Sequence, residues 1–528
     1  MELLMGKGSF ALGERITGHA PGPGTLVVSH LGHRVSESEC GEDFVLDALP
    51  EGGYALSWTG ADGLRADSAF DVLANPWSRL RYGFVADFGP DVDAHAHARW
   101  AARLHLTAVQ FYDWAWRHEF LVHADPVYAD PLGRTVSNAT LRALRDAYTA
   151  VGAKSCAYAA VYAVDREGWE RWSGRGLYHA DGVPYALGGD FLWIVDPSDP
   201  VWQQHLADQL QSAVEHGFSA FHLDQYGWPK RAFRSDGSPV DLGAAFPALL
   251  DALGDSVHAR WMFNNVNDFP TERTARAQQD ATYIEVWDPH TTYQDLQDVI
   301  AKARAANPAR AVILAAYLPQ LASASDAGTD AALMLAQAAI CSAGGQHLIA
   351  GGVERVLVDP YYVNNRPLRH SAAAVLVRMQ DLAVALGDLL QAPDRIDITR
   401  RIAFGINEEL QLTSSVPIRP DAEVNSLWVR VVESSHGLTL HCINLLDQSD
   451  IAWNTDKAPI ASHATLDISL EPLFTRHEIL WWDDRDGAVA HVAEALQESG
   501  RVRCSIPIRS AWTVVQISPD PRHQLSAR

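Results

Sequence analysis

A chain of 528 residues is too long for one compact core, so the sequence predicts two or three domains. Its hydrophobic content of 47% and charged content of 20% are typical of a globular protein and exclude a disordered one. The formal charge of −23 argues against nucleic-acid binding, because a polyanion would be repelled. The same charge suits a neutral or cationic ligand.

The compartment is predicted from the cysteines and the N-terminal residues. None of the five cysteines forms a CxxC pair, so we expect free thiols in a reducing environment. Residues 1–6 lack the basic and apolar segments of a signal peptide, and no run of about 18 apolar residues is present to span a membrane. These features predict a cytoplasmic protein without membrane contact, although a secreted enzyme stripped of its leader would look the same.

The first region, residues 1–76, is expected to form a small β-sandwich of the immunoglobulin type. Short runs with strand character cover 25–31, 43–50 and 53–58. Gly-Pro and Gly-Gly clusters between these runs supply the turns.

The second region, residues 77–394, repeats a pattern of strand, loop and helix. Helical patterns include 93–104, the segment from Ser137 to about 150, and 370–388. Eight near-continuous apolar strands between such helices predict a closed parallel (β/α)₈ barrel. The expected strands are 82–88, 106–114, 155–162, 218–224, 261–267, 281–287, 311–318 and 346–351.

In the third region, residues 395–528, the hydrophobic period returns to two. Residues 426–433 and 438–445 flank a Ser-Ser-His-Gly turn and predict a hairpin, and later strands are expected near 476–482 and 511–517. This region is expected to be a second, antiparallel β-sandwich without a part in the chemistry.

Polar and aromatic side chains gather at the ends of the predicted barrel strands. Asp224 ends the fourth strand and Glu285 lies at the end of the sixth. A carboxylate at the C-terminal tip of a barrel strand is typical of a catalytic group, and two such carboxylates beside aromatic rings suggest a glycosidase. The alternative is that both are structural carboxylates, which are common at strand ends in this fold.

Other chemistries receive less support from the sequence. His95 and His97 are two residues apart on a helix and do not face one another, and His118 and His123 lack the HExxH pattern of a zinc enzyme. There is neither a GxSxG elbow nor a Gly-rich phosphate loop, so we expect no metal ligand set and no cofactor. A structural calcium ion stays open.

The strand-end segments together resemble glycoside hydrolase family 66, the dextranases and cycloisomaltooligosaccharide glucanotransferases. The resemblance spans roughly residues 75–390, and the order of so many segments is more specific than any one of them. The matching segments are Phe111-Tyr112-Asp113-Trp114, Arg117-His118, Ala157-Tyr158, Tyr162, Phe221-His222-Leu223-Asp224, Asn264 to Asn267, Tyr283-Ile284-Glu285-Val286-Trp287 and Asp359-Pro360-Tyr361-Tyr362.

The resemblance implies that Asp224 is the nucleophile and Glu285 the acid/base of a retaining enzyme that cleaves α-1,6-linked glucan, dextran or isomaltooligosaccharides. We then expect the two carboxyl groups to lie about 5–6 Å apart. Around them we expect sugar hydroxyls to meet amides and carboxylates, and sugar rings to stack on aromatic side chains. The expected substrate-binding residues are Tyr112, Asp113, Trp114, His118, Tyr158, Tyr162, His222, Gln225, Asn265, Asn267, Trp287, Asp359 and Tyr361.

Two other activities stay open within this interpretation. Cyclising family members carry a long carbohydrate-binding insertion, and the longest gap between predicted strands here, residues 163–217, leaves little room for one. The sequence therefore favours hydrolysis over cyclisation, and the missing leader predicts action on short, imported isomaltooligosaccharides. A non-catalytic glucan-binding protein built on an inactive barrel is the third alternative.

Overall fold

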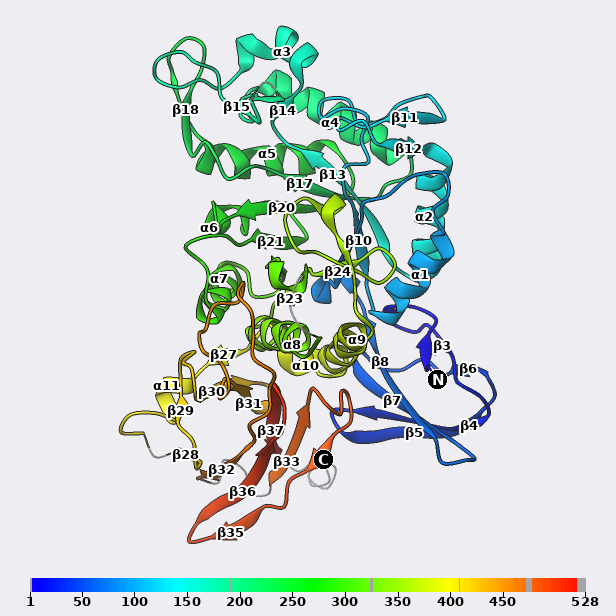
Figure 1. Cartoon of the computed structure of the whole chain (residues 1–528), viewed down its shortest axis with the longest axis vertical. Coiled ribbons are helices and arrows are strands. Elements are labelled where there is room, and N and C mark those ends of the chain that lie inside the picture. Colours follow the sequence, from blue (N-terminus) through cyan, green and yellow to red (C-terminus); the bar gives the residue numbers. More distant parts are fainter. Residues whose placement is uncertain (1, 190, 323–325, 408, 472–476, 520–528) are drawn as a thin grey trace.

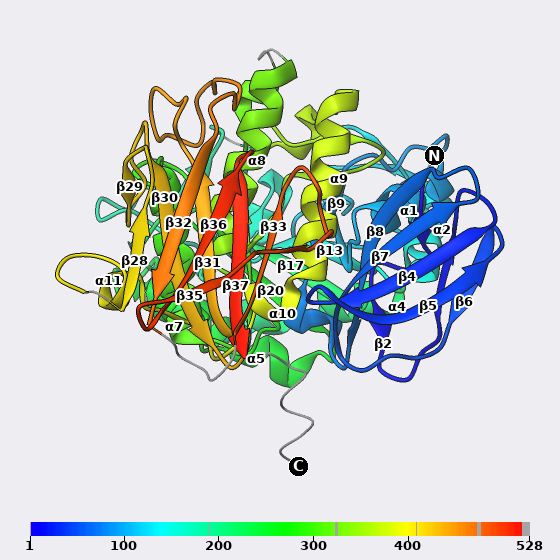
Figure 2. The ribbon, with the colours of Figure 1, turned by 90° about the horizontal axis from the view of Figure 1, so that it is seen from below.

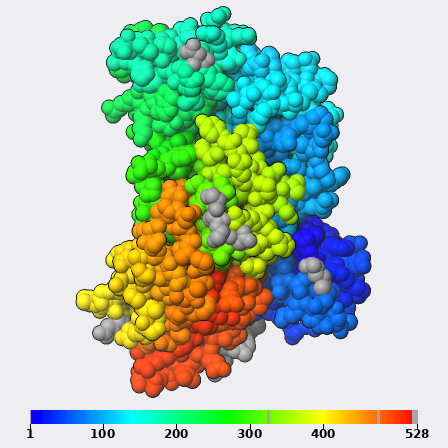
Figure 3. All heavy atoms as spheres, in the orientation of Figure 1, coloured from blue at the N-terminus to red at the C-terminus, as the bar shows by residue number. Residues whose placement is uncertain are grey.

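The computed structural model describes residues 2–189, 191–322, 326–407, 409–471 and 477–519. A barrel and its helices form the centre of the molecule. Two β-rich regions, one from each end of the chain, pack against the same side of the barrel (Figures 1 and 2). The space-filling view shows these two β-rich regions next to each other below the barrel (Figure 3). They touch directly, because His33 lies 2.9 Å from Glu478.

Eight parallel strands form the central sheet, as the sequence predicted. Neighbouring strands pair in chain order from β9 to β23, so each strand follows its predecessor around the barrel. Most of their residues are buried, because both faces of the sheet are covered. The strands are β9 (Tyr82–Val85), β10 (Ala108–Phe111), β13 (Lys154–Ala160), β17 (Ala220–Asp224), β20 (Arg260–Val266), β21 (Ala281–Glu285), β22 (Ala311–Ala315) and β23 (Gln346–His347).

The last predicted strand, 346–351, is wrong in its extent. Only β23 pairs with the barrel, and the chain then forms a separate strand, β24 (Ala350–Gly351), that pairs with β25 (Arg355–Val356) and through it with β26 (Arg366–Pro367). The backbone N–H of Gly352 donates a 2.7 Å hydrogen bond to Phe84 O on β9, where the first and last parts of the barrel meet. We call this contact the barrel seam.

Helices cover the outside of the barrel, and the chain specifies where several of them begin. The side chains of Asp93, Ser137 and Asp199 accept hydrogen bonds from the first turns of α1, α2 and α4, which fixes these N-termini. Among the helices in the described ranges, none is both long and apolar enough to cross a bilayer. The helices of at least ten residues here are α1 (Ala94–Arg103), α2 (Asn138–Ala150), α4 (Pro200–Glu215), α5 (Leu242–Ser256), α7 (Tyr293–Ala306), α8 (Asp326–Ser342) and α9 (His370–Ala385).

The N-terminal region consists of two sheets around a small aromatic core. Its polar strand β5 was missed by the sequence analysis, since alternation is hard to see in the exposed segment HRVSESEC. The other missed long strand, β8, packs on α9 and joins this region to the barrel. One sheet contains β2 (Phe10–Ala11), β8 (Arg65–Leu73), β7 (Gly52–Gly60), β4 (Gly24–His30) and β5 (His33–Cys40), and the other β1 (Leu4–Met5), β3 (Ile16–His19) and β6 (Asp43–Leu46).

The C-terminal region also has two sheets, and the predicted hairpin is confirmed as β30 and β31. Trp481, on β33, is buried between the sheets, stacks on His491 and lies beneath Arg509. The larger sheet contains β27 (Ile396–Asp397), β29 (Ile418–Arg419), β30 (Leu427–Ser434), β31 (Gly437–Asn444), β37 (Trp512–Pro519), β33 (His477–Asp483) and β34 (His491–Val492). The smaller sheet contains β28 (Leu410–Thr413), β32 (Ala464–Leu470), β36 (Arg501–Ile508) and β35 (Leu496–Glu498).

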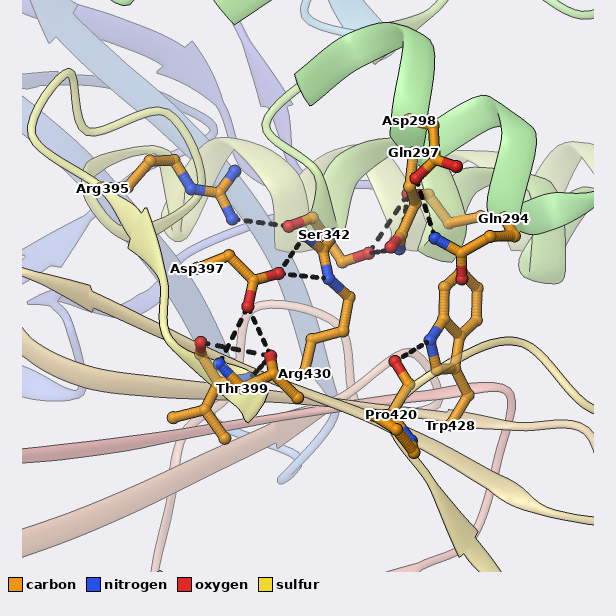
Figure 4. A network of polar contacts seen from close by, with 12 residues as sticks. Gln294, Gln297, Asp298, Ser342, Arg395, Asp397, Thr399, Pro420, Trp428 and Arg430 are labelled. Carbon is orange, nitrogen blue, oxygen red and sulfur yellow. Dashed lines mark hydrogen bonds and ion pairs between the residues drawn. The ribbon is translucent and has the colours of Figure 1, made fainter. Parts of the chain in front are cut away.

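A polar contact of Arg395 links the C-terminal region to the barrel helices. Figure 4 shows Arg395 reaching the carbonyl of Ser342 at the end of α8, a contact of 2.5 Å. Beside it, Asp397 accepts hydrogen bonds from Arg430 on β30. Burial lowers the pKa of the Arg395 guanidinium well below its ordinary value, so this contact stabilises a costly charge inside the interface.

One segment departs from the regular barrel between β13 and β17. It forms a three-stranded sheet and a helix above the barrel, in the upper part of Figure 1. Residues 191–194 were predicted to be strand-like, and the rest of this sheet was not foreseen. We call residues 163–195 the excursion; its elements are β14 (Ala163–Val164), α3 (Arg166–Trp172), β15 (Ala186–Leu187) and β16 (Leu192–Ile194).

The barrel seam gives the first testable prediction, since a methyl group has no space there. A Cβ built on Gly351 would lie 2.2 Å from Phe84 O and 2.5 Å from Phe84 N, both backbone atoms that cannot rotate away. We expect Gly351→Ala to destabilise the fold by about 1–3 kcal/mol, measured by urea denaturation. Gly22→Ala is the matched control, because a Cβ at Gly22 has no neighbour within 4 Å. Equal stability of the two variants would contradict the close contact at the seam.

Candidate active site

The centre of the site is a pair of carboxylates bridged by one amide. Asp224 is the last residue of β17, Glu285 is the last residue of β21, and β20 lies between these strands in the sheet. From β20, Asn264 Nδ2 donates a 2.7 Å hydrogen bond to Asp224 Oδ1 and another of 2.7 Å to Glu285 Oε2. Because both oxygens contact the same nitrogen, they lie within about 5.5 Å of each other.

Strand alternation explains why these three side chains meet. Side chains two apart on a strand point to the same face, so His222 and Asp224 share one face of β17. Glu285 pairs in register with Val266, two residues beyond Asn264. The tips of three adjacent strands therefore present their polar groups to one point inside the barrel mouth.

The carboxylates line a cavity of about 280 Å³ at the C-terminal end of the barrel strands. Its residues all lie between positions 110 and 362, so neither β-rich region contributes to it. Aromatic rings form most of the wall, and amide and carboxyl groups form the floor. The lining residues are Gln110, Tyr112, Tyr158, Leu187, His222, Asp224, Gln225, Tyr226, Trp228, Asn264, Val266, Tyr283, Glu285, Trp287, Tyr317, Pro360, Tyr361 and Tyr362.

Burial raises the proton affinity of both carboxyl groups, and the charge of Asp224 adds to this effect at Glu285. Burial raises the pKa of Asp224 to about 6, while hydrogen bonds from Tyr158 and Asn264 act in the opposite direction. Burial and the nearby charge of Asp224 raise the pKa of Glu285 to about 7. As the pH rises, Asp224 is therefore the first to ionise, and the coupled pair holds one proton between these values.

Tyrosines support the carboxylates on two sides. The Tyr158 hydroxyl donates a 2.7 Å hydrogen bond to Asp224 Oδ2, the oxygen that Asn264 does not contact. Tyr112 stacks on Tyr362 at 4.4 Å between ring centroids, and the hydroxyls of Tyr362 and Tyr283 lie 2.9 Å apart. Asp224 is thus held by both oxygens, which fixes the direction in which its carboxylate points.

Of the thirteen expected substrate-binding residues, six line the cavity. Among them His222 is 2% exposed, and burial lowers its pKa to about 3, so its ring is neutral around pH 7. Gln225 donates to Asn264 O and Phe269 O, so its amide holds neighbouring loops together. The six are Tyr112, Tyr158, His222, Gln225, Trp287 and Tyr361.

Three of the predicted substrate-binding residues are buried away from the cavity. Trp114 is 0% exposed and donates from Nε1 to Tyr158 O, because the backbone turns sharply at Asp113, where φ is +51°. The Tyr162 hydroxyl donates to Trp228 O and accepts from Tyr226 N. Asn265 follows Asn264 and points to the opposite face of β20, where it bonds backbone and Thr274. All three support the loops and strands around the site.

The remaining four lie near the site without lining it. Asp113 and His118 border a much smaller pocket behind Tyr158, and burial raises the pKa of Asp113 to about 7. Asn267 donates to Asp288 O and accepts from Trp287 N, which holds the loop after β21. Asp359 accepts from Tyr361 N and Asn364 in an exposed turn.

The sequence analysis missed several residues that the structure brings together. Asn264 lies at a predicted strand end but is absent from the expected substrate-binding residues. It shares the inward face of β20 with Val266, whereas its neighbour Asn265 points to the other face. Tyr317 and Tyr362 come from the seventh strand and from the segment after the barrel seam. Strand alternation was the signal for Asn264, and Tyr362 lies in the matching segment 359–362, whereas nothing local marks Tyr317.

Comparison with known proteins identifies the family. A model of glycosyl hydrolase family 66 matches residues 53–515. The chain belongs to glycosyl hydrolase family 66. The resemblance that the strand-end segments suggested is therefore confirmed.

Two relatives of this family 66 chain carry the names of glucan-acting enzymes. A cycloisomaltooligosaccharide glucanotransferase of Niallia circulans is 28% identical over 295 residues, which are 50% of this chain and 30% of that protein. A dextranase of Streptococcus salivarius is 24% identical over 209 residues, 32% of this chain and 25% of that protein. The matched parts are thus less than a third of either relative's length.

A solved structure agrees with the fold over nearly the whole chain. It is a cycloisomaltooligosaccharide glucanotransferase of Paenibacillus sp. in complex with cycloisomaltoheptaose. The TM-score is 0.87 at 19% identity, with 98% of this chain and 99% of that chain covered. The barrel and its two flanking β-rich regions therefore form the common architecture.

The buried carboxyl groups predict a pH-dependent stability. The pKa of Glu285 in the folded chain, about 7, lies above its ordinary value, so the folded state binds this proton more tightly than the unfolded state. The contribution of Glu285 to folding stability is therefore complete below its ordinary pKa and is lost as the pH rises through 7. We expect Glu285→Gln to raise the melting temperature relative to wild type by at least about 2 °C at pH 8 and less at pH 5.

Thermal melts at several pH values measure this difference. Exposed Glu170 provides the control, because Glu170→Gln changes a solvent-exposed side chain and should leave the melting temperature close to that of wild type. A Glu285→Gln variant whose advantage over wild type does not grow with pH would show that the carboxyl group is not destabilised by burial.

Proposed function

We propose that this enzyme cleaves α-1,6-glucosidic bonds of dextran or isomaltooligosaccharides with retention of the anomeric configuration. The observation behind the proposal is the single Asn264 amide that contacts both carboxylates. It keeps the two oxygens within the roughly 5–5.5 Å separation that suits direct attack, whereas inverting enzymes need about 6.5–9.5 Å to fit a water molecule. The α-1,6-glucan substrate is supported by the names of the dextranase and glucanotransferase relatives.

In the first step, Asp224 is the nucleophile and Glu285 is the general acid. Ionised Asp224 attacks the anomeric carbon, and the bond from that carbon to the glycosidic oxygen breaks as the ester bond forms. Protonated Glu285 gives its proton to the departing oxygen, so the released sugar is a neutral alcohol. Tyr158 and Asn264, which contact the two oxygens of Asp224, orient the attacking carboxylate.

In the second step the roles of the carboxyl groups reverse. Glu285, now ionised, removes a proton from water or from a sugar hydroxyl, whose oxygen attacks the anomeric carbon. The ester bond breaks and Asp224 regains its negative charge. A water acceptor gives hydrolysis, and the far end of the same chain as acceptor gives a cyclic product, so one pair of carboxylates supports both outcomes.

Cyclising transfer is the second candidate activity. The glucanotransferase of Niallia circulans is 28% identical over its matched part, and the Paenibacillus sp. glucanotransferase structure is covered over 99% of its chain. The limited room in the longest gap between predicted strands, residues 163–217, was expected to favour hydrolysis. This reasoning loses its force because a glucanotransferase chain aligns with 98% of this one. Chromatography of the products from dextran distinguishes linear oligosaccharides from cyclic ones.

The roles of the two carboxylates can be tested directly. We expect Asp224→Asn and Glu285→Gln each to lower turnover on dextran at least about a thousandfold, since each removes one group that double displacement requires. Reducing-sugar release measures the rate, and NMR of the first product gives its anomeric configuration. Glu170→Gln is again the control. Near-normal turnover in either active-site variant, or an inverted first product, would contradict the mechanism.

The two pKa values predict the pH profile. Activity needs Asp224 ionised and Glu285 protonated, so kcat/KM should rise as the pH passes about 6 and fall as it passes about 7. Tyr158→Phe removes a hydrogen bond that lowers the pKa of Asp224, so the rising limb should move to higher pH. The falling limb should move less, since Tyr158 does not bond Glu285. Rate profiles from pH 4 to 9 measure both limbs, and a rising limb that stays in place would exclude this role for Tyr158.

A further inference from the structure

A row of aromatic side chains leads out of the catalytic cavity onto the excursion. Trp228, half-buried, lines the cavity beside Leu187 of the excursion. The ring of Tyr185 lies 5.8 Å from that of Trp228, and His179 stacks on Tyr185 at 3.7 Å between ring centroids. Tyr185 is half-buried and His179 is exposed. We call Trp228, Tyr185 and His179 the aromatic row.

The backbone that holds this row is firmly attached. Tyr185 N donates to Leu177 O, and Ile194 N donates to Tyr185 O, so Tyr185 is bonded on both sides within the excursion sheet. A second hairpin, β18 (Arg231–Phe233) and β19 (Pro239–Asp241), exchanges two backbone hydrogen bonds with Tyr178 through Phe233. The aromatic rings are therefore placed before any ligand arrives, which lowers the entropy lost on binding.

We propose that the aromatic row is an outlying binding site for glucosyl units of an isomaltooligosaccharide chain whose reacting bond lies at Asp224 and Glu285. The inference rests on the proposed function and extends it to substrate length. The apolar faces of sugar rings stack on aromatic side chains, and the row is continuous with the cavity through Trp228. The row therefore adds affinity only for chains long enough to reach beyond the cavity.

The test compares short and long substrates on variants of the outer row. Tyr185→Ala should raise KM for isomaltoheptaose roughly tenfold, with kcat within about twofold, and should leave isomaltotriose kinetics unchanged. Tyr185→Phe keeps the ring and should behave like wild type. Val183→Ala is the matched control, because Val183 is exposed in the excursion, two residues before Tyr185, and lies outside the row. Melting temperatures verify that each variant is folded.

The possible outcomes separate the two proposals. Suppose that wild type cleaves isomaltoheptaose and that Tyr185→Ala has the same ratio of KM for isomaltoheptaose to KM for isomaltotriose as wild type. The aromatic row is then not a binding site, while the proposed function stands. If wild type cleaves no α-1,6-glucan, both proposals fall. If Tyr185→Ala does not fold, His179→Ala replaces it, because His179 is exposed. This variant should also raise KM for isomaltoheptaose. An unchanged ratio of the two KM values would again contradict binding at the aromatic row.

Discussion

The burial of two carboxylates beside one amide is the constraint on which the site depends. An isolated carboxylate loses its hydration when it is buried, and a second one nearby adds repulsion. Hydrogen bonds from Asn264 and Tyr158 partly offset these costs. Desolvation and repulsion still outweigh them, because the pKa values of both carboxyl groups remain raised. The pKa values of the two groups, raised to about 6 and about 7, suit the nucleophile and acid roles proposed for them.

The barrel supplies the rigidity that this arrangement needs. Asp224, Asn264 and Glu285 are at the ends of three hydrogen-bonded neighbouring strands, so their separation follows from the spacing and register of the sheet. The flanking β-rich regions pack on α8 and α9 and stay clear of the cavity. Stability and chemistry are thus assigned to different parts of the chain.

The sequence predicts the periodic parts of this molecule well. Apolar runs located all eight barrel strands, and Ser137 and the Ser-Ser-His-Gly turn marked a helix start and a hairpin. It predicts less well where the backbone leaves its regular path. The positive φ at Asp113 turns Trp114 into the core, and the chain leaves the barrel after His347 to make β24. Both events depend on contacts between residues distant in sequence, such as Phe84 with Gly352.

The excursion begins and ends on the barrel, between β13 and α4, and among its described residues Leu187 alone lines the cavity. It is therefore a module that can vary while the strand ends that hold the two carboxylates remain fixed. Insertions, deletions or substitutions in such a module alter the outer surface of the cleft at little cost to the barrel core. The architecture thus allows the reaction to stay constant during evolution while the region around the cleft diversifies.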